Sequence, residues 1–181
     1  PEEFAQSLAS LAQMGVQIFG GCCGTTPEYI RLLREALCQT QVRPAPRHVP
    51  PAVCSATKVV PIDRVRVIGE RINPTGKKRL QQALRAGDSA YPCAQAVAQA
   101  EAGAEVLDVN AGLPGIDEAA VLERLVCELQ AVTDLPLQLD SSDPAALARA
   151  LRVYNGKPIV NSVNGEQKTL DAILPLCKKY G

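Results

Sequence analysis

The sequence predicts an α/β protein in which helices cover a parallel β-sheet. Two observations lead to this fold class. From about residue 65 onward, short strand patterns alternate with helical patterns four times. The strand patterns are apolar along most of their length, which is typical of strands in a buried parallel sheet. The expected strands are residues 65–69, 105–109, 135–139 and 158–160, and the expected helices are residues 91–102, 117–132, 144–153 and 167–179.

The amino-terminal segment, residues 1–39, is predicted to form a helix, a strand, a turn and a second helix, in that order. An apolar helical pattern comes first, and residues 16–19 then form a short apolar run that predicts a strand. A glycine-rich turn follows at residues 20–24. Thr26 and Pro27 supply an N-cap and a proline at the first helical position, so we expect the second helix to begin there.

Residues 40–64 differ in composition from the segments on either side. Five prolines lie in this span, and no acidic residue occurs between Glu35 and Asp63. Proline removes backbone donors and favours extended conformations, so the pattern predicts a semi-rigid linker and a domain boundary. The single histidine, His48, lies in this span, and we interpret it as an exposed residue outside any site.

Composition argues against several classes of function. The 181 residues contain 19 Lys plus Arg and 19 Asp plus Glu, so the formal net charge is zero. A nucleic-acid-binding surface needs clustered basic charge, and four Tyr and two Phe with no Trp offer few rings for base stacking. No apolar run approaches the roughly 18–20 residues that a membrane span needs. Because the chain begins with Pro1 rather than Met, we expect a processed or excised piece.

Seven cysteines are scattered along the chain, and only Cys22 and Cys23 are adjacent. An odd number cannot all pair in disulfides, so we expect a reducing, cytoplasmic compartment. Thiolates are soft ligands that suit zinc, and the flanking glycines permit a backbone that points both side chains at one ion. Two ligands do not complete a zinc site, however. The alternative is a pair of buried or merely adjacent thiols.

Polar side chains lie at or just after the carboxyl end of each of the four expected strands. They are Glu70, Asp108 with Asn110, Asp140, and Asn161. The carboxyl ends of parallel strands lie at one edge of the sheet, where ligand sites form, so we expect these side chains to converge in one pocket. The alternative at each position is a helix cap or a turn former. Carboxylates and amides without His, Cys or Lys suit hydrogen bonding to a flat heterocycle, and Asp140 could accept two bonds from a guanidine-like edge.

Two separate parts of the chain resemble known families. Residues 19–27, Phe-Gly-Gly-Cys-Cys-Gly-Thr-Thr-Pro, resemble the closing motif of the homocysteine S-methyltransferase barrel. Residues 69–76, Gly-Glu-Arg-Ile-Asn-Pro-Thr-Gly, resemble the pterin-binding barrel of methyltetrahydrofolate methyltransferases, as do residues 107–110, 139–142 and 161–164. The order of the two parts, with a linker between them, is similar to that in the family of cobalamin-dependent methionine synthases.

The resemblance implies a parallel (β/α)8 TIM-barrel type of fold, present as two partial barrels. Residues 1–39 would be the end of the homocysteine-binding barrel, residues 40–64 the proline-rich linker, and residues 65–181 the first half of the pterin-binding barrel. It also implies that Cys22 and Cys23 are two of three zinc ligands. The third cysteine, which the family places upstream, is absent from this sequence.

The resemblance also assigns roles to the strand-end residues. Asp140 and Asn161 would hydrogen-bond the pterin ring. Asp108 and Asn110 would line the same pocket, and Glu70 would support it.

The activity implied by the resemblance is methyl transfer in methionine biosynthesis. A methyl group would pass from N5 of methyltetrahydrofolate, by way of cobalamin, to a homocysteine thiol activated by zinc. Cobalamin would be carried by a partner domain, because no Asp-x-His-x-x-Gly segment occurs in the chain. Two alternatives stay open. One is a non-catalytic pterin-binding fragment that is inactive alone, and the other is an enzyme similar to dihydropteroate synthase.

Overall fold

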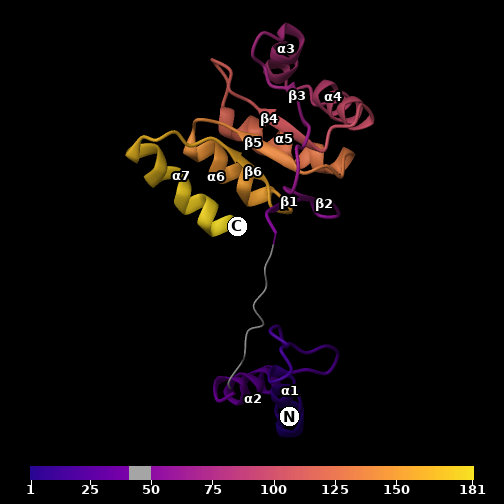
Figure 1. Ribbon diagram of the computed structural model, residues 1–181, viewed down its shortest axis with the longest axis vertical. Helices are drawn as coiled ribbons and strands as arrows, with labels where there is room; N and C mark the ends of the chain where they lie inside the picture. Colours follow the sequence, from indigo (N-terminus) through magenta and orange to yellow (C-terminus); the bar gives the residue numbers. More distant parts are fainter. Residues whose placement is uncertain (41–49) are drawn as a thin grey trace. The chain divides into compact units, whose positions relative to one another are not determined.

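The computed structural model of the chain describes residues 1–40 and 50–181. The chain divides into two compact units, which we call unit 1 (Pro1–Val49) and unit 2 (Pro50–Gly181). Figure 1 shows the elements of both. His48 and the first part of the predicted linker lie outside the described residues.

Unit 1 contains two helices that pack against each other, α1 (Glu2–Ala12) and α2 (Pro27–Cys38). The rings of Phe4 and Tyr29 meet edge to face, with centroids 5.3 Å apart. The start of α2 at Pro27 agrees with the sequence. The strand predicted at residues 16–19 is wrong, because no strand of the described chain lies beside it to accept and donate backbone hydrogen bonds.

Unit 2 is built on a four-stranded parallel sheet, which confirms the predicted fold class. Each strand begins and ends one to three residues later than its sequence pattern suggested. The polar residues at the carboxyl ends therefore belong to the strands themselves. In spatial and chain order the strands are β3 (Ile68–Ile72), β4 (Val106–Asn110), β5 (Leu137–Asp140) and β6 (Ile159–Asn161).

Five helices of unit 2 lie next to one another in chain order (Figure 1). Two of them begin at side-chain caps, where Asp117 accepts from the Ala120 N–H and Asp143 accepts from the Ala145 N–H. The first of the five was not expected from the sequence. The helices are α3 (Lys78–Ala86), α4 (Ala90–Glu101), α5 (Glu118–Val132), α6 (Pro144–Val153) and α7 (Gln167–Tyr180).

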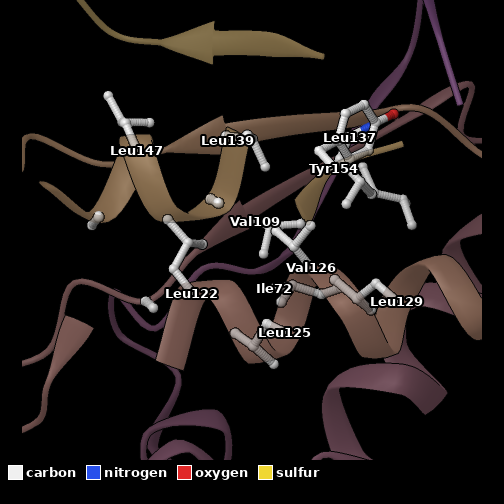
Figure 2. Packing of buried hydrophobic residues seen from close by; sticks show 14 of the residues in the cluster. Ile72, Val109, Leu122, Leu125, Val126, Leu129, Leu137, Leu139, Leu147 and Tyr154 are labelled. Carbon is white, nitrogen blue, oxygen red and sulfur yellow. The ribbon is translucent and has the colours of Figure 1, made fainter. Parts of the chain in front are cut away.

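The main core lies between the helices and one face of the sheet. Successive side chains of a strand point to opposite faces, so the residues of β4 and β5 divide between the two sides. Val109, Leu137 and Leu139 are fully buried and pack with apolar side chains of the helices (Figure 2). The helix residues labelled in this cluster are Leu122, Leu125, Val126, Leu129 and Leu147. The alternate residues of both strands therefore face the other side of the sheet.

Part of the predicted linker is instead a β-hairpin, formed by β1 (Ala52–Cys54) and β2 (Val59–Pro61). Val53 and Val60 are buried against Val106, at the amino-terminal end of β4. The density of prolines obscured this short strand pair in the sequence. The hairpin thus covers one end of the sheet, and the opposite end holds the polar residues.

Tyr154 joins the hairpin to the sheet. Its hydroxyl donates to the Cys54 carbonyl over 2.8 Å and accepts from the Leu137 N–H over 3.1 Å. Burial raises the pKa of this phenol to about 12. In the part of the chain that the structure describes, no helix is long and apolar enough to cross a membrane.

Candidate functional site

The strand register brings the predicted polar residues together. Asn110, Asp140 and Asn161 lie directly opposite one another on β4, β5 and β6. Two residues earlier, Asp108 lies opposite Gln138. A hollow of about 230 Å³ opens on this face, and it is lined by Ile68, Glu70, Asp108, Gln138, Asp140 and Asn161.

Asp108 is the most deeply buried carboxylate of this group, with 2% of its surface exposed. Its Oδ1 accepts a hydrogen bond from Gln138 Nε2 over 2.6 Å. Its Oδ2 is buried and has no partner among the described residues. Loss of hydration is the largest effect and raises the pKa of Asp108. The hydrogen bond from Gln138 opposes it, the nearby charges of Asp140 and Glu70 raise the pKa further, and Asn73 has a smaller lowering effect. The site therefore contains a carboxyl group that is protonated more readily than an exposed aspartate.

Asp140 is held by side-chain amides. Its Oδ2 accepts from Asn110 Nδ2 over 2.9 Å and lies 3.5 Å from Asn73 Nδ2. The same Asn73 nitrogen is 3.4 Å from Oε1 of Glu70, whose side chain is exposed. Asn73 is thereby placed between two carboxylates, to both of which it can donate.

The two asparagines beside Asp140 differ in their environments. The oxygen of Asn110, Oδ1, accepts from the Gly112 N–H over 2.7 Å, so both ends of this amide have protein partners. Asn161 lines the hollow, and its carboxamide bonds to no group within the described residues. Its amide is consequently free to donate to and accept from a ligand.

The loop after β5 is tied to its neighbours by Ser141, which is buried. The Ser141 hydroxyl donates to Glu118 and accepts from the Asp143 N–H, and the Ser141 N–H donates to the Asn161 carbonyl over 2.9 Å. A second hollow of about 200 Å³ adjoins this loop and shares Asp140 with the first. Its lining residues are Asp140, Ser141, Ser142, Ser162, Asn164 and Thr169.

Sequence reasoning missed two polar residues of this site. Gln138 stands between two leucines in Leu137–Asp140, and a polar residue alternating with buried apolar ones was a usable signal for the open face. Asn73 belongs to the motif at residues 69–76 but follows the end of β3, so its distance from Asp140 depends on the tertiary structure.

The residues of the first hollow make it rich in hydrogen-bond acceptors. Three carboxylates and two amides line it, and no lysine or arginine does so. Negative charge concentrated in this way repels anions and favours a ligand edge that carries several N–H donors. The geometry suits recognition of a flat, donor-bearing ring rather than covalent attack on a substrate.

The adjacent cysteines of unit 1 are exposed, and their Sγ atoms lie 3.7 Å apart. Hydrogen bonds from the backbone and thiol of Cys23 lower the pKa of Cys22. Within the described residues, no cluster of three or more His, Cys, Asp or Glu side chains could hold a metal. Cys22 and Cys23 therefore supply two soft donors but do not complete a zinc site by themselves.

Comparison with known proteins finds two family matches, one within each structural unit. The Pterin binding enzyme family matches residues 69–181, and the Homocysteine S-methyltransferase family matches residues 1–37. Methionine synthases of Mycobacterium leprae and Mycobacterium tuberculosis are each 35% identical to this chain, over 175 and 170 residues respectively. Both alignments cover 92% of this chain, which spans 14% of the length of either relative.

A solved structure supports the fold of unit 2. Dihydropteroate synthase of Xanthomonas albilineans superposes with a TM-score of 0.50 at 26% identity, covering 71% of this chain and 47% of the other. The comparisons confirm the resemblance to a segment of methionine synthase and the parallel α/β fold inferred from the sequence. The match over residues 69–181 covers more than half of the sequence, and the chain belongs to the pterin-binding enzyme family.

Proposed function

We propose that this chain is the segment of a methionine synthase that binds methyltetrahydrofolate as methyl donor. The observation that carries the proposal is the row formed by Asp140 and Asn161 at the carboxyl ends of adjacent strands, beside a hollow rich in acceptors. The family match over residues 69–181 and the names of the mycobacterial relatives support it.

Recognition of the pterin ring follows from the donor pattern of its edge. The 2-amino group and N3–H of a pterin form a guanidine-like pair of donors, which a carboxylate such as Asp140 can accept. The free carboxamide of Asn161 can pair with the neighbouring donors and acceptors of the ring. The dihydropteroate synthase of Xanthomonas albilineans is described in complex with 6-chloroguanine, a flat ring that also carries a 2-amino group.

Release of a methyl group from N5 requires that the nitrogen gain positive character, because a tertiary amine is a poor leaving group without it. The role we assign to this chain is to bind the ring and supply an acidic environment for it. Asp108 could share a proton with the ring more readily than an exposed aspartate would, since burial and the neighbouring carboxylates raise its pKa. Glu70 and Gln138 would support the same region of the site.

Two cofactors belong to the proposed parent activity. Bound cobalamin would accept the methyl group from the folate, and we assign it to a partner domain because the sequence has no Asp-x-His-x-x-Gly segment. Bound zinc would keep the homocysteine thiol deprotonated. Cys22 and Cys23 would be two of its ligands, with a third donor from another part of the protein. We also propose a cytoplasmic location, which is supported by seven free cysteines.

The pterin proposal is tested by Asp140→Ala in the natural protein that carries this chain. We expect methyltetrahydrofolate binding, measured by calorimetry, to weaken by about 1–3 kcal/mol, because a charged hydrogen-bond acceptor is lost. Asp134→Ala is the matched control, since Asp134 lies just before β5, at the end of the sheet away from the site. Equal affinities of the two variants would reject the role of Asp140.

The structural likeness to dihydropteroate synthase favours a second candidate activity, condensation of a pterin with an aromatic amine. A further alternative is a pterin-binding module that has no activity by itself. These proposals give different results when the natural protein is supplied, in separate assays, with methyltetrahydrofolate, cobalamin and homocysteine, or with a pterin diphosphate and 4-aminobenzoate. Formation of methionine supports the first, formation of a pteroate from a pterin diphosphate and 4-aminobenzoate supports the second, and binding without either product supports the third.

A further inference from the structure

The orientation of the Asn110 carboxamide is fixed by its two partners. The Gly112 N–H donates to one end of the amide over 2.7 Å. Because a backbone N–H can only donate, the atom that receives it must be the amide oxygen. The amide nitrogen therefore faces the Asp140 carboxylate at 2.9 Å, where it can only donate. Both ends of the Asn110 amide are thus engaged by the protein, and Asn110 is not among the residues that line the hollow.

The Asp140 carboxylate is consequently held at one of its oxygens. Oδ2 accepts from Asn110, with the longer contact to Asn73 as a second restraint. Oδ1 has no hydrogen-bond partner within the described residues. Because Asn110 and Asp140 are opposite each other on adjacent strands, the pair is short and rigidly supported by the sheet. This support fixes the plane of the carboxylate.

Asn161 provides an internal comparison. It lies opposite Asp140 on the other side, so the same carboxylate has an asparagine on each neighbouring strand. Asn161 is among the residues that line the hollow, whereas Asn110 is not. Two residues of the same type in the same row of the sheet therefore have different surroundings, and their roles should differ accordingly.

We propose that Asn110 is a positioning residue that acts through Asp140 and does not touch the ligand. By holding Oδ2, it aims Oδ1 at the donors of the ring edge. The inference rests on the proposed function, because it takes the ligand to be a pterin bound by Asp140. It revises the expectation that Asn110 lines the pocket.

The test compares two ligands that differ at the edge facing Asp140. Pterin has an amino group at C2, and lumazine has an oxygen there. We would measure dissociation constants of both by calorimetry in the natural protein that carries this chain and in its variants Asn110→Ala, Asp140→Ala and the double variant. Asn110→Asp is a second variant that keeps the acceptor for the Gly112 N–H but loses the donor to Asp140. Asn155→Ala is the control, because Asn155 is exposed and lies before β6, away from the site.

The unmodified protein and the Asn155→Ala variant are expected to prefer pterin over lumazine by about tenfold or more, as the loss of a charged hydrogen bond predicts. Asn110→Ala and Asn110→Asp should both reduce this preference to near the value for Asp140→Ala. In the double variant, the loss of Asn110 should not reduce the preference for pterin any further than Asp140→Ala does alone.

Other outcomes separate the two proposals. If both Asn110 variants weaken the two ligands by the same factor, the preference survives and the positioning role is overturned. If the unmodified protein itself does not prefer pterin, the proposed function fails, and the role of Asn110 fails with it. Far-ultraviolet circular dichroism would verify that each variant is folded before its affinities are compared.

Discussion

Replacement of Asp108 by asparagine is expected to stabilise unit 2 while weakening its binding of a pterin. The Asp108 side chain is buried, and its Oδ2 has no partner within the described residues. Asparagine has nearly the same shape and keeps an oxygen for the 2.6 Å bond from Gln138. Its new N–H donors face a hollow that contains the carboxylates of Glu70 and Asp140. The substitution thus removes an uncompensated charge and adds a donor among acceptors.

The size of the effect follows from the cost of an unsatisfied buried group, about 1–3 kcal/mol. Part of this cost is already offset by the Gln138 hydrogen bond, so we expect Asp108→Asn to raise the free energy of unfolding by about 1–2 kcal/mol at pH 7. Asp134→Asn is the control, because its side chain is 63% exposed and its ion pair with Lys58 spans 4.0 Å. That change should stay within about 0.5 kcal/mol.

The difference in stability between Asp108→Asn and the wild-type chain should depend on pH in a defined direction. Folding raises the pKa of Asp108 above its ordinary value of 3.8, so the folded chain binds this proton more tightly than the unfolded chain. Below pH 3.8 the group is protonated in both states and costs no stability. As the pH rises from there through the raised pKa, the wild-type chain loses stability relative to Asp108→Asn.

Urea unfolding of the 181-residue chain, followed by circular dichroism at several pH values between 4 and 8, measures this difference. The gap between Asp108→Asn and wild type should widen as the pH increases. A variant that is less stable than wild type at pH 7 would refute the reasoning, because the carboxylate would then be compensated by interactions we have not identified. A gap that is constant with pH would show that the effect arises from packing and not from titration.

Three further predictions concern the hairpin, the start of the sheet and the cysteines. Tyr154→Phe should lower the free energy of unfolding by about 1–3 kcal/mol in urea titrations, because a buried backbone N–H of β5 loses its acceptor. The control Tyr91→Phe should change the free energy of unfolding by less than about 0.5 kcal/mol. Arg66→Ala should lower the free energy of unfolding in the same assay, since this guanidinium, whose side chain is 13% exposed, bonds to two carboxylates and a carbonyl. No loss would show that water replaces those contacts. Cys22 and Cys23 should both react with a thiol reagent, and elemental analysis of the 181-residue chain should find no stoichiometric zinc; one equivalent would reveal a third ligand.

The sequence predicted the sheet well because the signal for it is local. Each strand is a short apolar run followed by a polar residue, and each helix has its own apolar stripe and, at Asp117 and Asp143, a cap. The alternation along β4 and β5 contains a further local signal, which our predictions did not use, that places Asp108 and Asp140 on the face away from the buried leucines. These features depend on neighbours in the sequence, so the position of one strand can be predicted without knowledge of the others.

Features that depend on distant partners could not be predicted in this way. The hairpin is stable because Val53 and Val60 bury themselves against Val106 and because Tyr154, a hundred residues further on, bonds to Cys54. Conversely, residues 16–19 have a suitable strand composition but no partner strand among the described residues. The pairing of Gln138 with Asp108 and of Asn110 with Asp140 likewise follows from strand register, which is a property of the assembled sheet.

The same strands supply both the core and the candidate site, and this arrangement makes the two experimentally separable. Along β5, Leu137 and Leu139 pack against the helices, while Gln138 and Asp140 face the hollow. Substitutions on the helix-facing side should therefore lower stability. Those on the acceptor-rich side remove charges that repel one another, so they should preserve or raise stability while weakening ligand binding. A protein that is less stable than its neutral site variants is expected where the charges are retained for binding. Asp108 is the residue at which the effects on stability and on ligand binding should be most clearly opposed.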